Sequence, residues 1–411
     1  MEEIFKSEKW GYRESTVITV ALFLIGVLLQ FAIPTIEIEK LKFPFSLAIA
    51  LIFVNAIVLS YFGLKHARLI QWLASVPAAI SSISLLGILT LAMGFIPQTN
   101  DASNNLLGIH NLLNTWYFIF AIVFFLITLG FVSLKRLVPF KWKNIGFILN
   151  HFGLWLAVFA GIIGNADITD VSISLQENRT SWIAFDKKKT PIQLPFTLKL
   201  LDFSMEEYAA KPLLIKPSNS KTETTIQAFI PNAKNDSLFA LEGLQIKVQK
   251  RLMTAVFRKN TFVEFDTIGS CQAFLVSVYD TQQDTNYTGW ISNGSNNEQP
   301  NMLTVSNNRT IALSTAEAKK FSSNVVITNI NKEIDTVTIE VNKPYNMGLW
   351  SIYQYDYDTQ KGRWSDVSVL QIVHDPWLIL VYIGLAMVIL GSIYLLFTRG
   401  SSNDNSKQSE Q

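Results

Sequence analysis

Apolar residues gather in long blocks toward both ends of the chain, and a polar stretch separates them. Residues 16–166 and 376–398 contain long segments almost free of charge, whereas residues 167–375 are polar and rich in turn residues. A helix needs about 20 consecutive apolar residues to cross roughly 30 Å of hydrocarbon with its backbone hydrogen bonds closed internally. Six segments qualify: 16–36, 44–64, 69–97, 112–134, 145–164 and 376–398. The pattern predicts about six membrane spans and a water-soluble insert before the last span.

The polar insert shows the alternation that is typical of strands. Apolar and polar residues alternate in 196–200, 244–248, 325–330 and 337–341, and clusters of Asn, Gly, Ser and Pro lie between such segments. This pattern predicts a β-rich domain, sandwich-like or barrel-like, over residues 167–375. After the last span, residues 399–411 are polar and are expected to form a disordered cytoplasmic tail.

The positions of lysine and arginine predict the orientation of the spans, because short cytoplasmic loops are enriched in these residues. They precede the first span, follow the last span and occupy alternate loops: Lys6, Lys9, Arg13, Lys65, Arg68, Lys135, Arg136, Lys141, Lys143 and Arg399. Both termini are therefore expected in the cytoplasm. Residues 167–375 are expected on the outer face, together with the short turns at 37–42 and 98–111.

Composition agrees with a membrane protein and narrows its chemistry. Hydrophobic residues make up 49% of the 411 residues and charged residues 16%, below the roughly 25% of an ordinary soluble domain. The net charge of +2 gives no reason to expect nucleic acid as a partner. The single cysteine, Cys271, cannot form an internal disulfide. We interpret it as a small buried side chain rather than as a reactive thiol.

Several chemistries lack their motifs in this sequence. It contains no CxxC pair for thiol exchange and no CxxCH haem attachment site. A glycine-rich phosphate loop, a nucleophile elbow and a zinc-protease motif are also absent. The interiors of the predicted spans hold no charged residue, which argues against an ion-coupled transporter that uses buried carboxylates. We therefore assign no catalytic residue and expect a membrane scaffold with one intramembrane imidazole.

Four histidines are candidate ligands. His151 lies in the fifth predicted span, about six residues from its cytoplasmic start, where an ionisable group is costly and is a functional hypothesis by default. The alternative is a neutral imidazole that hydrogen-bonds a neighbouring helix, through Asn150 or another polar residue. His110, in an outer turn, and His374, where the insert re-enters the membrane, can each be interfacial polar residues. His66 is interpreted as a solvated loop residue.

Five segments, taken in order, share a pattern with one known family. They are Gly94-Phe95-Ile96-Pro97-Gln98, the Trp-led span 116–136, His151-Phe152-Gly153-Leu154, Leu194-Pro195-Phe196-Thr197-Leu198 running on to Tyr208, and a closing pattern of Val341-Asn342-Lys343-Pro344, Gly348, Ile352-Tyr353-Gln354, Asp375-Pro376 and Gly384. In these segments the chain resembles the ResB (CcsB) family of System II cytochrome c biogenesis. Trp377, where the family more often has Gly, departs from the pattern. The domains implied are two extra N-terminal helices (1–68), a ResB-like core of three helices (69–166), the outer domain (167–375), the last helix (376–398) and the tail (399–411).

This resemblance implies a function, a cofactor and partners. It implies a protein of the bacterial cytoplasmic (inner) membrane with a periplasmic domain, which handles haem and presents it for attachment to the CxxCH motifs of apocytochrome c. His151 would be an axial ligand of the iron of haem b, and His374 and His110 are further candidates. The haem would be transient and shared with a Trp-rich partner subunit of ResC (CcsA) type. The chain would be part of a cytochrome c haem lyase complex and not an enzyme alone.

Two other functions are consistent with the sequence. The first is a non-catalytic membrane scaffold or sensor whose outer β-domain binds a protein or envelope ligand, with His151 only packing helices. It predicts normal levels of c-type cytochromes in a deletion strain. The second is a permease-like subunit of an exporter with its ATPase on another chain, which the single bulky insert and the few polar span residues make less attractive.

Overall fold

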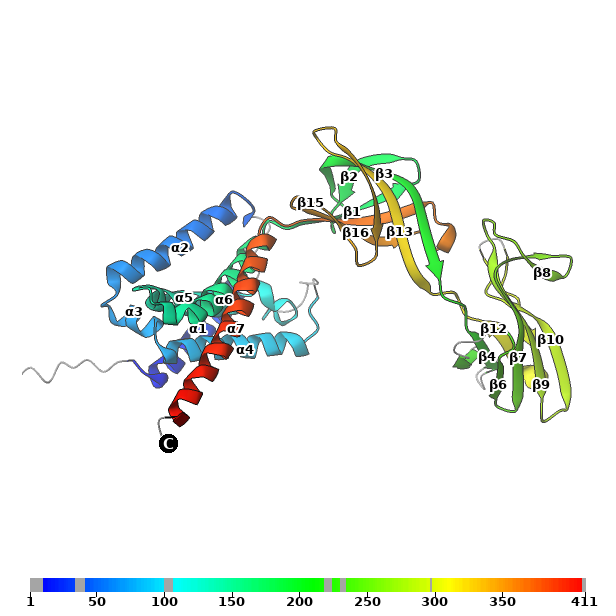
Figure 1. Cartoon of the computed structure of the whole chain (residues 1–411), viewed down its shortest axis with the longest axis horizontal. Helices are drawn as coiled ribbons and strands as arrows, with labels where there is room; N and C mark the ends of the chain where they lie inside the picture. The colour runs from blue at the N-terminus through cyan, green and yellow to red at the C-terminus, as the bar shows by residue number, and fades with distance from the viewer. Residues whose placement is uncertain are drawn as a thin grey trace, which may run out of the picture. The chain divides into compact units, whose positions relative to one another are not determined.

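The computed structural model describes residues 10–33, 41–99, 106–217, 224–229, 234–295 and 298–408. The chain divides into a helical unit, Met1–Thr169 with Asp375–Gln411, and a β unit, Asp170–His374. Figure 1 shows helices in the first unit and strands in the second. The predicted fold class, a polytopic helical membrane protein with a β-rich domain inserted before the last span, is confirmed.

Six helices of the helical unit are long and apolar enough to cross a membrane, counted over the described residues. The elements of this unit are α1 (Tyr12–Ala32), α2 (Phe45–Leu64), α3 (Arg68–Leu73), α4 (Val76–Phe95), η2 (Ile109–Asn114), α5 (Trp116–Leu137), η3 (Trp142–Asn144), α6 (Ile145–Gly164) and α7 (Leu378–Gln408). α6 has the bounds that the sequence predicted. α7 continues through residue 408, whereas the polar composition predicted a disordered tail from residue 399, and residues 409–411 lie outside the described residues.

Two helix starts differ from the apolar pattern for local reasons. The third predicted span is divided into α3 and α4, because Ser75 has an extended backbone and Pro77 lies in the first turn of α4. Proline has no amide hydrogen, so it is tolerated at a helix start and disfavoured in a helix interior. α5 begins after Thr115, whose hydroxyl accepts a hydrogen bond from the Phe118 amide and caps the helix.

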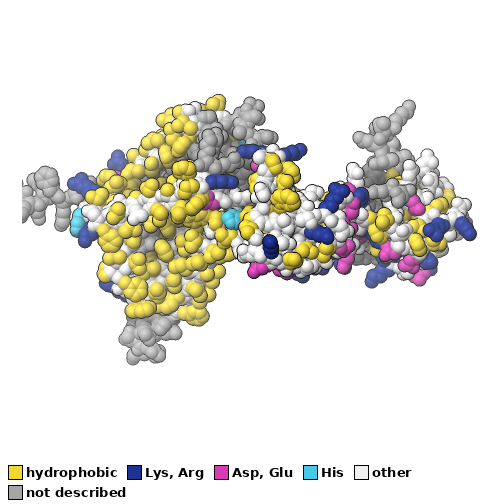
Figure 2. All heavy atoms as spheres, turned by 90° about the horizontal axis from the view of Figure 1, so that it is seen from above, with side chains coloured by type: hydrophobic (Ala, Val, Ile, Leu, Met, Phe, Trp, Pro, Cys, Tyr) yellow, Lys and Arg dark blue, Asp and Glu magenta, His cyan; other side chains and the backbone are white. Residues whose placement is uncertain are grey.

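Apolar side chains are exposed on the surface of the helical unit, as the face drawn in Figure 2 shows. Phe95 is 86% exposed, Phe397 79% and Leu28 68%. Water-soluble proteins do not expose apolar surface on this scale, whereas the hydrocarbon of a bilayer accepts it. α5 is the most buried of the six long helices and forms the centre of the unit.

The β unit begins and ends in one eight-stranded sheet. Its order is β14-β13-β3-β2-β1-β17-β16-β15. The strands are β1 (Thr169–Gln176), β2 (Thr180–Phe185), β3 (Pro191–Glu207), β13 (Ala318–Thr328), β14 (Ile334–Glu340), β15 (Tyr345–Met347), β16 (Trp350–Tyr357) and β17 (Val367–His374). Three strands separate β13 from β17, yet Ser323 on β13 donates to Ser368 on β17 (2.6 Å) and to Gln354 on β16 (2.6 Å). The sheet is therefore rolled around one apolar core.

The middle of the β unit is a sandwich of two further sheets. One has the order β10-β9-β7-β6, with β8 paired to β7, and the other has the order β11-β12-β4-β5. The strands are β4 (Pro212–Pro217), β5 (Thr224–Phe229), β6 (Leu238–Leu241), β7 (Leu244–Arg258), β8 (Thr261–Glu264), β9 (Cys271–Asp280), β10 (Thr285–Ser292), β11 (Leu303–Thr304) and β12 (Thr310–Leu313). Side chains such as Ile246, Val276 and Ile311 are fully buried in a core that both sheets share. The strands predicted at 196–200 and 244–248 lie within β3 and β7.

One ion pair is buried in this sandwich. The guanidinium of Arg309 donates to the carboxylate of Asp280 over 2.7 Å, and both side chains are almost wholly buried. Arg309 also donates to the carbonyl oxygens of Ser306 (3.1 Å) and Glu242 (3.1 Å). The Ser306 hydroxyl, followed by backbone amides and Arg309, holds the pKa of Asp280 below its usual range. A buried charge needs this degree of pairing to be tolerated.

Candidate functional site

His151 lies on α6 and is half-buried. Its Nδ1 is 3.0 Å from the carbonyl oxygen of Phe147, one turn earlier. Because a carbonyl oxygen can only accept, Nδ1 carries the proton in this bond and the neutral ring has its lone pair on Nε2. Among the described residues, nothing else hydrogen-bonds this ring. The imidazole also stacks on the Phe147 ring, with 3.7 Å between centroids and 17° between planes, and the Arg136 guanidinium lies 5.3 Å from that ring.

The helix that carries His151 is fixed by close backbone contact with α7. A Cβ on Gly153 would lie 2.7 Å from the carbonyl oxygen of Gly384, and a Cβ on Gly384 would lie 2.6 Å from the amide nitrogen of Ala157. The Asn150 side chain donates to the Ser392 hydroxyl across the same interface (2.8 Å). Small residues allow such packing in membrane helices. The polar contact between helices is thus made by Asn150, and the hydrogen bond of His151 stays within α6.

An apolar pocket of ≈ 310 Å³ is lined in part by residues of α6. Side chains of α2, α5 and α6 line it, and Ile148 and Phe152, which flank His151 in the sequence, are among them. Trp155 closes part of the pocket and donates from Nε1 to the Leu126 carbonyl oxygen of α5 (2.9 Å). The pocket is almost entirely apolar, so it suits a hydrophobic body and offers no second metal ligand.

The other histidines lie on other elements of the chain. His110 lies on η2, where its Nδ1 donates to the Pro97 carbonyl oxygen (2.9 Å). Trp155 of α6 hydrogen-bonds Leu126 of α5, which places His151 level with a position about 14 residues after the start of α5. His110 precedes that start. At 1.5 Å per residue this is about 20 Å, too far for both rings to bind one iron. His374 ends β17 in the β unit and packs on Trp350, with 4.6 Å between ring centroids. His66 is exposed in the turn after α2.

No group of three or more His, Cys, Asp or Glu side chains in the described part of the chain could hold a metal ion. His151 is therefore not part of a preformed metal cluster among the described residues. A second ligand for any metal at this position would have to come from outside the described residues of this chain.

Asp167, which the sequence did not single out, ties three parts of the helical unit together. Its carboxylate accepts from the Phe43 amide (2.6 Å), the Ser46 hydroxyl (2.7 Å) and Nε1 of Trp377 (2.7 Å). Partial burial would raise the pKa of Asp167, but the bonds from Ser46, Trp377 and Phe43 outweigh burial and lower it. Trp377, the departure from the family pattern, thus has a structural partner at the end of α6.

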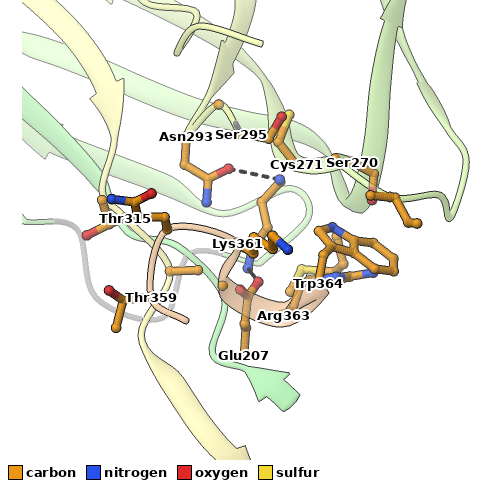
Figure 3. A pocket seen from close by; sticks show the side chains of 18 residues that line it. Glu207, Ser270, Cys271, Asn293, Ser295, Thr315, Thr359, Lys361, Arg363 and Trp364 are labelled. Atoms are coloured by element: carbon orange, nitrogen blue, oxygen red, sulfur yellow. Dashed lines mark hydrogen bonds between the residues drawn. The ribbon is translucent and has the colours of Figure 1, made fainter. Parts of the chain in front are cut away.

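A second pocket, of ≈ 430 Å³, lies in the β unit. Three turns that are distant in the sequence form most of it: 268–272 before and at the start of β9, 293–295 after β10, and 359–364 around η5 (Gly362–Trp364). Figure 3 shows their side chains around one hollow, with Glu207 at its border. No sequence motif pointed to this pocket, because its residues meet only through the fold.

A family comparison matches this region. Residues 269–366 match the model of the ResB-like family. This segment runs from the turn before β9 to the turn after η5 and contains fifteen of the eighteen residues that line the β-unit pocket, all except Glu207, Met253 and Ile268. The predicted resemblance to the ResB family is thus confirmed, and the match supports a role in cytochrome c biogenesis.

Other comparisons add little to the family match. No curated protein matches the chain. The solved structure of a protein named "Cytochrome c Heme Lyase CcmF" aligns with 95% of this chain and 46% of that chain, at 9% sequence identity and a TM-score of 0.24. The chain therefore spans less than half the length of that protein, and a TM-score this low does not establish a shared fold.

The ResB-like segment and the motifs noted in the sequence overlap only in part. Of those motifs, only Val341-Asn342-Lys343-Pro344, Gly348 and Ile352-Tyr353-Gln354 lie within residues 269–366. His151, His110 and His374 all lie outside the ResB-like segment. Their assignment as haem ligands therefore stays a prediction.

Proposed function

We propose that this chain is a haem-handling subunit of a cytochrome c maturation complex, with His151 as one axial ligand of the haem iron. The family match supports cytochrome c biogenesis as the process. The observation that carries the more specific role is the state of the His151 ring. Its Nδ1 proton is engaged by the Phe147 carbonyl oxygen, which leaves the Nε2 lone pair for a metal.

The surroundings of His151 fit a haem as cargo. The apolar pocket on α2, α5 and α6, which Ile148 and Phe152 line although His151 does not, provides a hydrophobic wall on the same helix. Arg136, which lies over the Phe147 ring, provides a cation near the same helix end and could pair with a propionate. A bound haem would supply redox-active iron, and the residues of this chain would orient it through one ring nitrogen and exclude water from one side.

The second axial ligand is proposed to come from a partner. His110 lies about 20 Å along α5 from the level of His151, and His374 belongs to the β unit. We propose a Trp-rich membrane subunit of ResC (CcsA) type as the partner and apocytochrome c as the acceptor of the haem. It follows that the isolated chain binds haem b weakly and that the pair binds it firmly.

We also propose the orientation that the lysine and arginine pattern predicts. Both termini and the loop between α5 and α6 lie in the cytoplasm, in the bacterial cytoplasmic (inner) membrane, and the β unit lies in the periplasm. His151, six residues into α6, would then lie toward the cytoplasmic side, where haem enters.

Co-expression of the chain with its partner subunit tests the role of His151. The haem content of the purified pair is measured from its absorption spectrum for the wild type, His151→Ala and His66→Ala. We expect most of the haem to be lost in His151→Ala and restored by imidazole added to the medium, because free imidazole can occupy the vacated axial position. His66→Ala, in an exposed loop, is the matched control and retains its haem.

A full haem content in well-folded His151→Ala protein would remove this ligand assignment. In that case the second candidate, a membrane scaffold whose β unit binds a ligand, becomes the better description. The pocket in the ResB-like segment is the observation that favours it. A deletion strain separates the two functions, since only the first predicts loss of mature c-type cytochromes.

A further inference from the structure

The pocket of the β unit contains two buried polar atoms without a hydrogen-bond partner. They are Oγ of Ser270 and Nε1 of Trp364, and no group in the described ranges satisfies either atom. The Ser270 residue is only 6% exposed. A buried donor left unpaired is unfavourable, and nearly all such groups in folded proteins have a protein, water or ligand partner. The indole N–H can only donate, so its missing partner is an acceptor.

The charged side chains of the pocket favour an anion of low charge. Arg363 and Lys361 line the pocket from the η5 turn, with Lys361 paired to Asp366, and Glu207 is the one carboxylate among the lining residues. Arg363 donates to Asp266 over 2.7 Å through Nη2, which leaves its other N–H groups available. The guanidinium carbon of Arg363 also lies 4.4 Å from the Trp364 ring centroid, and this stacking fixes its plane. The cation is thus held in place beside the unpaired indole donor.

The single cysteine, Cys271, carries no negative charge that would repel an anionic ligand. Burial, followed by the charge of Glu298, raises the pKa of Cys271 to about 11. Its thiol is therefore protonated at neutral pH and adds no negative charge to the pocket. A neutral thiol also makes this pocket a poor site for a soft metal ion, because the thiolate is the metal-binding form.

The rim of the pocket is apolar. Ile268 is 76% exposed and Met253 is 37% exposed, and both line the pocket. Apolar side chains at the mouth of a pocket with a few convergent polar groups are typical of a small-molecule site. A ligand that fits has an apolar body for the rim and an acceptor for the donors inside.

We propose that this pocket binds an amphipathic carboxylate, with its carboxylate group on Arg363, Trp364 and Ser270 and its apolar body against Ile268 and Met253. This binding site is independent of the haem ligand proposed on α6 and does not rest on it. It gives the ResB-like segment a ligand of its own. The carboxylate could be carried by a small organic acid or by the side group of a larger planar molecule.

Two substitutions that remove opposite charges from the same pocket provide the test. The full chain is placed in lipid nanodiscs, and equilibrium dialysis measures the binding of 2-naphthoate to the wild type, Arg363→Gln and Glu207→Gln. We expect Arg363→Gln to weaken binding about three- to tenfold and Glu207→Gln to strengthen it by a similar factor. Partition of the probe into lipid is the same for all three proteins and cancels from the comparison.

Probes of different charge show which chemistry the pocket prefers. The amide 2-naphthamide has the same apolar body without a charge, so its binding should differ little between the three proteins. Protoporphyrin IX and its dimethyl ester extend the comparison to a planar molecule with and without carboxylates. Preferential binding of the free acid places the carboxylate on the larger molecule, and binding of 2-naphthoate alone indicates a small acid.

Equal binding of 2-naphthoate and 2-naphthamide, or binding that neither substitution changes, would overturn the proposal. Tighter binding of 2-naphthyl phosphate than of 2-naphthoate would overturn the assignment of a carboxylate. Thermal unfolding checks that each variant is folded, and Glu207→Gln keeps the test decisive if Arg363→Gln is unstable. The binding of 2-naphthoate should be the same for His151→Ala and the wild type, so failure of this site and failure of the His151 site can be told apart.

Discussion

In the helical unit many apolar side chains are exposed, and α6 and α7 pack closely through Gly153 and Gly384. In the β unit the order is reversed, with Leu198 and Ile246 fully buried in two separate cores. Among the described residues, the buried polar side chains of the helical unit are uncharged, such as Ser82 and Thr128, and one imidazole is half-buried on α6. The β unit instead buries an ion pair, Asp280 with Arg309, and satisfies both charges. Different kinds of substitution are therefore expected to destabilise the two units.

The comparison also separates two kinds of candidate site. His151 has one ring nitrogen engaged and one available, on a helix whose Ile148 and Phe152 line an apolar pocket. The β-unit pocket has unpaired donors and a cation within mixed surroundings. An ionisable side chain within a membrane span, such as His151, is costly and indicates a role with a metal or a proton. Unpaired buried donors, such as those of the β-unit pocket, indicate a ligand that accepts hydrogen bonds. We therefore propose two different sites in one chain, one for haem iron and one for an anion.

The largest effect is expected from Gly153→Leu in the helical unit. The new side chain would enter the space of the Gly384 carbonyl oxygen, so α6 and α7 must separate, at a cost of about 3 kcal/mol. Gly161→Leu is the matched control, since a Cβ there meets no atom within 4 Å. Thermal unfolding in detergent, followed by size-exclusion chromatography, measures both. Equal stability of the two variants would mean that α6 and α7 do not pack through these glycines.

The next largest effect is expected in the β unit from Arg309→Met. It leaves the Asp280 carboxylate buried without its cation, and the unfolding temperature of this unit should fall by about 6 °C or more. Lys247→Met is the control, because Lys247 pairs with Asp236 at 3.2 Å but both side chains are about half or more exposed. Its effect should be small. Similar shifts in the two variants would show that the Asp280–Arg309 pair is not shielded from water.

Acid should weaken the β unit through carboxylates of depressed pKa. The Ser306 hydroxyl foremost lowers the pKa of Asp280. For Asp170, hydrogen bonds from Gln371 and Lys187 outweigh burial and lower the pKa. A carboxylate whose folded pKa is below its unfolded value, about 3.9, stabilises the fold fully above that value and loses the contribution as pH falls through the folded pKa. Circular dichroism melts should show a flat unfolding temperature from pH 5 to 8 and a decline below pH 4; a decline that begins near pH 6 would contradict this.

The smallest effect is expected at Cys271. With a pKa of about 11 and 5% exposure, the thiol should react with maleimide far more slowly than a free cysteine at pH 7. Cys271→Ala should change the unfolding temperature little. Labelling at pH 7 is followed by mass spectrometry, with unfolded protein in urea as the reference. Rapid labelling of the folded protein would show that the β-unit pocket opens to solvent.

The sequence was sufficient for features that repeat along the chain. The six spans follow from runs of apolar residues, and the bounds of α6 were predicted as 145–164. Strands such as β3 and β7 follow from alternation. The division between α3 and α4 was not predicted, because the apolar run continues through Ser75 and only the backbone requirement of Pro77 interrupts the helix.

Features made by residues far apart in the sequence could not be predicted in this way. Asp167 looks like an ordinary polar residue after α6, yet it binds Ser46 and Trp377. The β-unit pocket joins turns that are about 70 residues apart along the chain, such as 293–295 and 359–364. His151 was identified from its depth in a span alone, and the structure adds which ring nitrogen is free of hydrogen bonds.

The axial role of His151 is tested most directly by the reduction potential and absorption spectrum of haem in the co-expressed pair, measured for His151→Met. A thioether in place of the imidazole keeps a ligand at this position but changes the iron. The account predicts a higher potential and an altered spectrum. An unchanged potential and spectrum at full haem content would contradict it, because no group of α6 would then touch the iron.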